Sequence, residues 1–129
     1  MIMSELAIPS SLTDMIIDIG YRAKPEGALI RTSMSGYKVL IFYDEKSLQF
    51  YFGLKDEEKK FTVQDANMFN KDNRFARCYL DSGGISFEMD VFFDVESASA
   101  KNDLDRFFET FEMIISSAGK ALSEASERD

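Results

Sequence analysis

The sequence predicts an α+β fold in which helices cover one side of an antiparallel β-sheet. Apolar and polar residues alternate in five segments, as expected of strands with one buried face. Three other segments carry apolar residues at helical spacing. The strands follow one another through short turns, which favours an antiparallel sheet. The predicted order is α-β-β-β-α-β-β-α, in a single domain that covers residues 1–129.

The first helix is predicted from Leu12 to about Gly20. Ser11 is followed three residues later by Asp14, which is the spacing of a capping box, and Gly20 stands where a left-handed C-cap is expected. The segment Tyr21–Gly27 contains a proline and is predicted to be a connector. The apolar stripe of this helix consists of Leu12, Met15, Ile16 and Ile19.

Three strands are predicted next, at Ala28–Met34, Tyr37–Tyr43 and Leu48–Leu54. The turns between them, at Ser35-Gly36 and Asp44–Lys46, are short enough to join neighbouring strands into a meander. The apolar face of the third strand is predicted to consist of Leu48, Phe50, Phe52 and Leu54.

The charged run Lys55–Lys60 is predicted to be a solvent-exposed loop, with a docking patch as the alternative. Thr62 and Asp65 again have capping-box spacing, and they predict a helix from Val63 to about Lys71.

A second hairpin is predicted from Arg74–Asp81 and Ile85–Phe93, joined by a turn at Ser82–Gly84. Ser99 is predicted to cap the last helix, and acidic residues at its start suit the helix dipole. Residues 123–129 are predicted to fray. The apolar stripe of the last helix consists of Leu104, Phe107, Phe108, Phe111, Ile114, Ile115, Ala118 and Leu122.

The formal net charge of −8 argues against binding to nucleic acid or to an anionic membrane, since both carry negative charge. No segment is apolar for long enough to predict a membrane span, and Met1–Leu6 does not resemble a secretory signal. Cys78 is the only cysteine, which excludes an intramolecular disulfide. These features predict a cytoplasmic location.

The sequence predicts no catalytic site, no cofactor and no metal. Histidine is absent, which removes the commonest general base and most zinc sites. Glu88 and Asp90 point the same way on a strand and could hold a metal, but a solvated row of carboxylates is the preferred interpretation. Cys78 is predicted to be a small buried residue. Arg77 is predicted to pair with this carboxylate row, and a contact with another protein is the alternative.

The central block Asn67–Asp81 resembles the YbjN family of bacterial sensory transduction regulators. In that family a short helix ends in an aromatic-Asn-basic step, as at Phe69–Lys71. The next strand reads Arg-Phe-Ala-Arg-x-Tyr-Leu-Asp, as at Arg74–Asp81. The segments Phe87–Asp90 and Gly20–Arg22 are also similar to the family pattern.

Two positions depart from that pattern. Phe69 stands where the family usually has Trp, and Glu96–Ser99 replaces a common Gly-Gly step. The resemblance implies a fold similar to that of type III secretion chaperones, which are small, acidic, cytoplasmic dimers that bind segments of effector proteins. That family fold has the same order of elements as the one predicted from patterning.

We therefore expect a non-enzymatic, chaperone-like or regulatory module that forms a homodimer and binds another protein or a peptide segment. A small-ligand sensor, with a pocket between the sheet and the last helix, is the alternative. The candidate partner-binding residues are Asn70, Arg74, Phe75, Arg77 and Tyr79.

Overall fold

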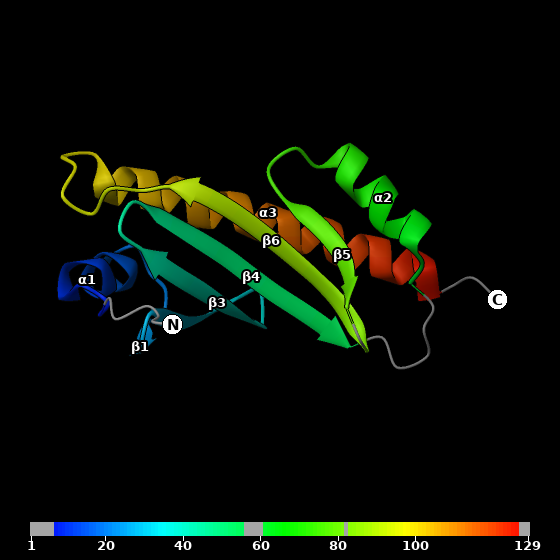
Figure 1. Ribbon diagram of the computed structural model, residues 1–129, viewed down its shortest axis with the longest axis horizontal. Helices are drawn as coiled ribbons and strands as arrows, with labels where there is room; N and C mark the ends of the chain where they lie inside the picture. Colours follow the sequence, from blue (N-terminus) through cyan, green and yellow to red (C-terminus); the bar gives the residue numbers. More distant parts are fainter. Residues whose placement is uncertain (1–6, 56–60, 82, 127–129) are drawn as a thin grey trace.

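The computed structural model describes residues 7–55, 61–81 and 83–126. These residues form three helices and one six-stranded antiparallel sheet with the strand order β1-β2-β3-β4-β6-β5 (Figure 1). The α+β class and the order of the predicted elements are confirmed. The elements are α1 (Ser10–Asp18), β1 (Lys24–Glu26), β2 (Leu29–Met34), β3 (Tyr37–Asp44), β4 (Ser47–Lys55), α2 (Val63–Asp72), β5 (Arg77–Asp81), β6 (Gly84–Phe92) and α3 (Ala100–Ser126).

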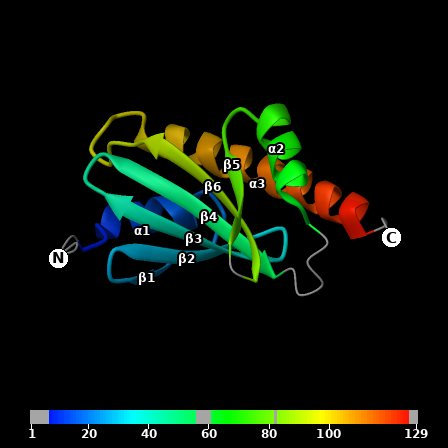
Figure 2. The same cartoon turned by 45° about the vertical axis from the view of Figure 1, so that its right-hand side comes forward.

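The sheet is built from a meander and a hairpin. Strands β2, β3 and β4 follow one another, and β6 then pairs with β4 along its whole length, with Phe52 opposite Phe87. Strand β5 forms one edge of the sheet beside β6, and β1 forms the other edge. The three helices lie on one side of this sheet, where α3 runs across it and α2 flanks β5 (Figure 2). We call the side that carries the helices the inner face.

Phenylalanine rings fill the layer between the inner face and α3. Phe50 lies 5.3 Å from Phe108 in an edge-to-face arrangement and 5.5 Å from Phe111, measured between ring centroids. Phe52 stacks on Phe87 at 4.8 Å. These five side chains are less than 2% exposed. Phenylalanine rings therefore form much of the core, and the layer is closely packed.

The ends of two helices follow from local chemistry. Helix α1 ends in a Schellman motif, in which Gly20 has a φ of +101° and the Tyr21 N–H donates to the Ile16 carbonyl. Helix α2 begins with the predicted capping box, because the Thr62 hydroxyl accepts from the Asp65 N–H at 3.1 Å and the Asp65 carboxylate accepts from the Thr62 N–H.

The residue after that Schellman motif anchors the connector to the last helix. The Tyr21 ring lies 4.5 Å from the Phe108 ring, and its hydroxyl donates a hydrogen bond to Glu112. Burial and this carboxylate raise the pKa of the Tyr21 phenol, so the phenol stays protonated. The Gly20–Arg22 segment noted in the sequence therefore has a structural role.

Three sequence-based expectations differ from the structure. The capping box at Ser11 and Asp14 is wrong, because α1 begins at Ser10, two residues before the predicted start, and follows Pro9 with no side-chain cap. The connector Tyr21–Gly27 contains the short strand β1, and the strand predicted from Arg74 begins only at Arg77. Strand β1 pairs with the adjacent β2 although it contains Pro25, a residue that favours a connector, and β5 begins only where its pairing with β6 begins, at Arg77 opposite Glu88.

The structure also bears on the two charged or polar segments. Helix α3 continues to Ser126, through the first four residues of the tail that was predicted to fray. Lys55 ends β4, and the rest of the charged run Lys55–Lys60 lies outside the described residues. No helix in the described part of the chain combines the length and apolar character needed to cross a membrane.

Replacing Phe50 with alanine is expected to lower the free energy of unfolding by about 3–5 kcal/mol, because it removes a fully buried ring and leaves a cavity. The matched control is Phe92→Ala, since Phe92 is 74% exposed and its removal should cost less than about 0.5 kcal/mol. Urea denaturation of both variants measures this difference. Equal losses in the two variants would contradict the proposed packing.

Candidate functional site on the outer face of the sheet

The side of the sheet that faces away from the helices is here called the outer face. None of the described helices covers it (Figure 1). Strand register brings every second residue to this face, so that Leu40, Tyr51, Glu88 and Arg77 stand opposite one another across four strands. Its side chains are Leu29, Arg31, Lys38, Leu40, Phe42, Gln49, Tyr51, Arg77, Tyr79, Glu88, Asp90 and Phe92.

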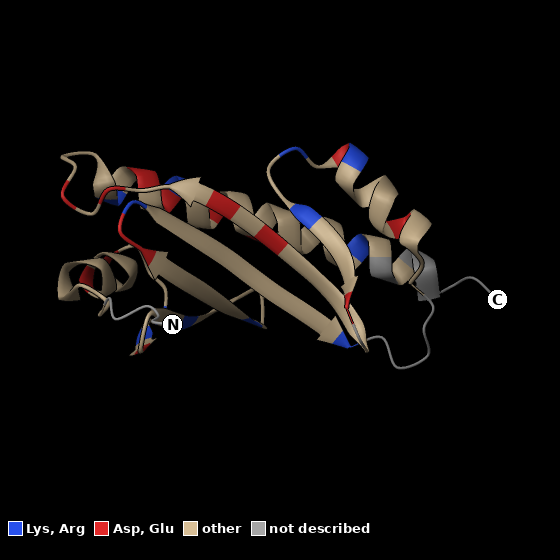
Figure 3. Ribbon diagram, viewed as in Figure 1, with Lys and Arg blue, Asp and Glu red and all other residues tan. Residues whose placement is uncertain are grey.

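A charged network joins β4, β5 and β6 on this face. The Arg77 guanidinium contacts Glu88 at 2.7 Å and Asp90 at 2.9 Å. The Tyr79 hydroxyl donates to Glu88 at 2.6 Å, and the Gln49 amide donates to Asp90 at 2.9 Å. Figure 3 shows the acidic segments of β6 beside the basic segment of β5. The predicted pairing of Arg77 with the carboxylate row is therefore confirmed.

Hydrogen bonds within the network affect the titration of Arg77 and Tyr79. The hydrogen bond to Asp90, with a second one to Glu88, raises the pKa of the Arg77 guanidinium. The hydrogen bond from Tyr79 to Glu88 raises the pKa of the Tyr79 phenol. Because arginine and tyrosine already titrate above neutrality, both groups remain protonated. Arg77 thus stays charged and Tyr79 neutral, and the geometry of the network is held by bonds within the chain.

Sequence reasoning missed two side-chain contacts on the outer face. Gln49 bonds to Asp90, and Tyr51 lies 3.0 Å from the Ser86 hydroxyl. Ser86 is only 1% exposed, although strand alternation predicted a wet position. Neither contact could be found without knowing that β4 pairs with β6, since 41 and 35 residues separate the partners in the chain.

Asn70 is engaged within the chain and not at the outer face. Its side-chain amide donates to the Cys78 carbonyl at 2.9 Å and accepts from the Cys78 N–H at 2.6 Å. Cys78 lies on β5, an edge strand, so these two bonds satisfy backbone groups that a further strand would otherwise pair with. The opposite edge strand, β1, is three residues long and contains Pro25. Both edges are therefore poorly suited to strand addition.

The other four predicted contact residues lie in two different parts of the structure. Arg77 and Tyr79 lie together on the outer face, whereas Arg74 and Phe75 lie in the connector that precedes β5. Phe75 is 71% exposed. A role for any of the five residues in binding a partner stays a prediction.

The groups considered for chemistry occupy ordinary structural positions. Cys78 is buried as predicted, and burial raises the pKa of its thiol to about 12, so little thiolate is present at neutral pH. Glu88 and Asp90 hold the Arg77 side chain between them. Among residues 7–55, 61–81 and 83–126, no cluster of three acidic or sulfur ligands suits a metal ion.

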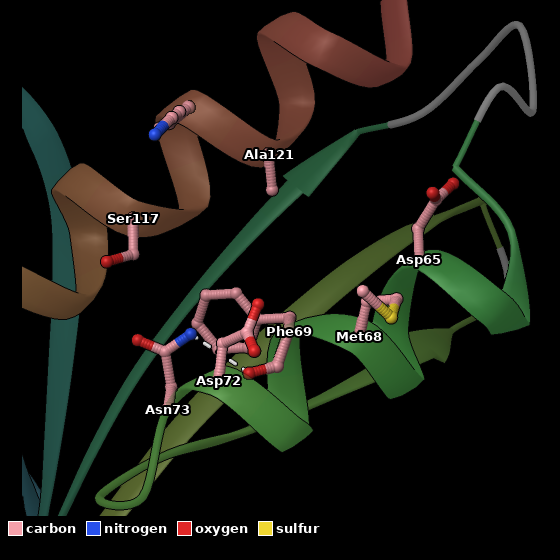
Figure 4. Close-up of a pocket in the computed structure, with 8 residues that line it drawn as sticks. Asp65, Met68, Phe69, Asp72, Asn73, Ser117 and Ala121 are labelled. Carbon is pink, nitrogen blue, oxygen red and sulfur yellow. Dashed lines mark hydrogen bonds between the residues drawn. The ribbon is translucent and has the colours of Figure 1, made fainter.

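A pocket of about 500 Å³ lies between α2 and α3 (Figure 4). Met68 and Phe69 of α2 face Ser117 and Ala121 of α3 across this gap. The alternative expectation placed a ligand pocket between the sheet and α3, but buried phenylalanine rings fill that layer. A small molecule would therefore find space beside α2.

Comparison with known protein families tests the resemblance of this chain to the YbjN family. The profile of the YbjN family, described as "Putative bacterial sensory transduction regulator", matches residues 8–124. The chain belongs to the YbjN family. The search of curated proteins finds no match to this sequence.

A crystal structure of YbjN from E. coli, described as a putative transcription regulator, has a similar fold. The TM-score is 0.57 at 10% sequence identity, and the alignment covers 95% of this chain and 91% of the other. At this identity the likeness concerns the fold. The YbjN fold therefore accounts for nearly the whole chain.

Replacing Asn70 with alanine is expected to lower the free energy of unfolding by about 1–3 kcal/mol, because two hydrogen bonds to Cys78 are lost. Hydrogen exchange at the Cys78 amide should also become faster. The control is Asn67→Ala on the same helix, an exposed residue whose side chain makes no hydrogen bond to any described residue. Unchanged exchange at Cys78 in the Asn70 variant would show that the amide does not protect this edge.

Proposed function

We propose that this YbjN-family protein is a non-catalytic regulatory module that binds another protein through the outer face of its sheet. The observation that carries the proposal is a fixed charged network on a face that no described helix covers, with exposed aromatic side chains on that face and in the connector that precedes β5. Phe92 is 74% exposed and lies two residues beyond Asp90, and Phe75 lies two residues before Arg77. Aromatic and arginine side chains are enriched at protein interfaces.

The fixed network supports this proposal for an energetic reason. Arg77, Tyr79 and Gln49 already hold their positions through bonds to Glu88 and Asp90. Binding a partner would therefore cost less side-chain entropy at these residues than at surface residues that are free to move. The exposed phenyl rings would supply apolar contact area.

The proposal names a protein partner rather than DNA or a membrane. The family description supports a regulatory role. The net charge of −8 opposes direct contact with phosphate-rich surfaces. A chaperone-like action in the cytoplasm, with the partner held as an extended or folded segment, agrees with this chemistry. Because both sheet edges are obstructed, we place the contact on the face of the sheet.

A small-ligand sensor is the second candidate function, and the pocket between α2 and α3 favours it. Its volume of about 500 Å³ is within the range of small-molecule sites. Native mass spectrometry of freshly purified protein would reveal a retained ligand. A mass equal to that of the bare chain would remove the support for this candidate.

The double variant Phe75→Ser/Phe92→Ser is expected to lose its protein partner while remaining folded, because both rings are mostly exposed. The matched control is Ile17→Ser/Met113→Ser, which removes two exposed apolar residues from helices. Each protein would be used as bait in bacterial lysate, and captured proteins would be compared by quantitative mass spectrometry. Equal capture by both variants and the wild type would contradict the proposed surface.

We also propose that the free protein is a homodimer that uses the same end of the outer face. Light scattering at tens of micromolar should then give twice the chain mass of 14.7 kDa. The Phe75→Ser/Phe92→Ser variant should give the monomer mass, because the apolar contact is lost. A wild-type mass of 14.7 kDa under these conditions would refute the dimer.

A further inference from the structure

A second feature lies at the opposite end of the outer face from Phe92. It is a hollow of about 340 Å³ over the paired ends of β4 and β6. Gly53 and Gly84 contribute only backbone to it, and Tyr51 and Ser86 supply hydroxyl groups. This combination of bare backbone and polar side chains differs from the aromatic end of the same face.

Close contacts leave little space for a side chain at either glycine. A Cβ atom at Gly53 would lie 2.7 Å from the Tyr51 hydroxyl, and one at Gly84 would lie 2.5 Å from the Leu54 carbonyl oxygen. The Tyr51 phenol leans over Gly53, and its hydroxyl lies 3.0 Å from the Ser86 hydroxyl. A side chain at Gly84 would therefore meet the Leu54 backbone, and one at Gly53 would move the Tyr51 phenol that lines the hollow.

Positive charge surrounds this hollow although the chain as a whole is acidic. Arg31, Lys38 and Lys55 line it, and Asp81 is the carboxylate among its lining residues. Arg31 is paired with Glu26 at 2.8 Å. Lys38 and Lys55 are exposed and have no ion-pair partner among the residues that the structure describes. Two exposed lysines therefore line one small concavity.

We propose that this hollow binds a small organic anion through a carboxylate or phosphate group. The ammonium groups of Lys38 and Lys55 would contact the anionic oxygens, since hydrogen bonds between opposite charges are the stronger ones. The Tyr51 ring and Leu40 would contact the rest of the molecule. The volume is at the lower end of the range for small-molecule sites, which suits a compact ligand. This site is separate from the aromatic end to which the protein partner is assigned.

The test is a titration of ¹⁵N-labelled full-length protein with inorganic phosphate and, separately, with succinate, at constant ionic strength. Saturable shifts of the Gly53 and Gly84 amide signals are expected with at least one anion. The anion that saturates identifies the group recognised, phosphate or carboxylate. The proposal is overturned if neither anion produces saturable shifts at tens of millimolar.

Two variants test the charge and the shape of the hollow separately. Lys38→Gln/Lys55→Gln should weaken binding about tenfold or more, because both charged contacts are lost. Gly53→Ala keeps every charge but forces the Tyr51 hydroxyl, which lines the hollow, away from its position, so binding should also weaken. The charge-matched control Lys71→Gln/Lys101→Gln changes lysines on α2 and α3 and should bind as the wild type does.

Equal weakening in the control and in Lys38→Gln/Lys55→Gln would overturn the proposal, since it would show a general charge effect. Wild-type affinity in both hollow variants would overturn it as well. Signals outside the hollow report whether each variant is folded. Because the Phe75→Ser/Phe92→Ser variant leaves the hollow intact, it should bind the anion normally whether or not the protein-binding proposal holds.

Discussion

The packing of phenylalanine rings between the sheet and α3 is the constraint on which the rest of this structure depends. Phe50 contacts two rings of α3, and Phe52 stacks on Phe87 of the neighbouring strand. These contacts fix α3 against the sheet and set the register of β4 and β6, because a shift by one residue would turn the rings outward. The inner face of the sheet is thereby buried, and none of the described helices covers the outer face.

What the outer face presents follows from that register. Pairing of β4 with β6 aligns Gln49 with Asp90 and Gly53 with Ser86. The first pair extends the charged network around Arg77, and the second lies in the hollow beside Lys38 and Lys55. The two edge strands are less suited to binding a further strand, because Asn70 bonds the Cys78 backbone of β5 and β1 is only three residues long. Binding through the face rather than the edge is therefore the consistent proposal.

The parts of this structure that sequence could predict are those with a local cause. Alternation located β2, β3, β4 and β6, and the spacing of Thr62 and Asp65 located the start of α2. The strand β1 was not predicted because Pro25 favours a connector, and β5 starts only where its pairing with β6 begins. The contacts of Gln49 and Ser86 depend on the pairing of β4 with β6, which are distant in the chain. The role of Asn70 was missed for the same reason, since its bonds to Cys78 replace strand pairing that no residue pattern marks.

We propose that the outer face is the surface that binds the partner and that the inner face and the helices support it. Hydroxyl-radical footprinting in living bacteria, compared with dilute purified protein, tests it most directly. We expect Phe42, Tyr79 and Phe92 of the outer face to be oxidised less in cells than in the purified protein. Ile17 of α1 and Met113 of α3 should be oxidised to the same extent in both. Protection of Ile17 and Met113, with Phe42, Tyr79 and Phe92 unchanged, would contradict it.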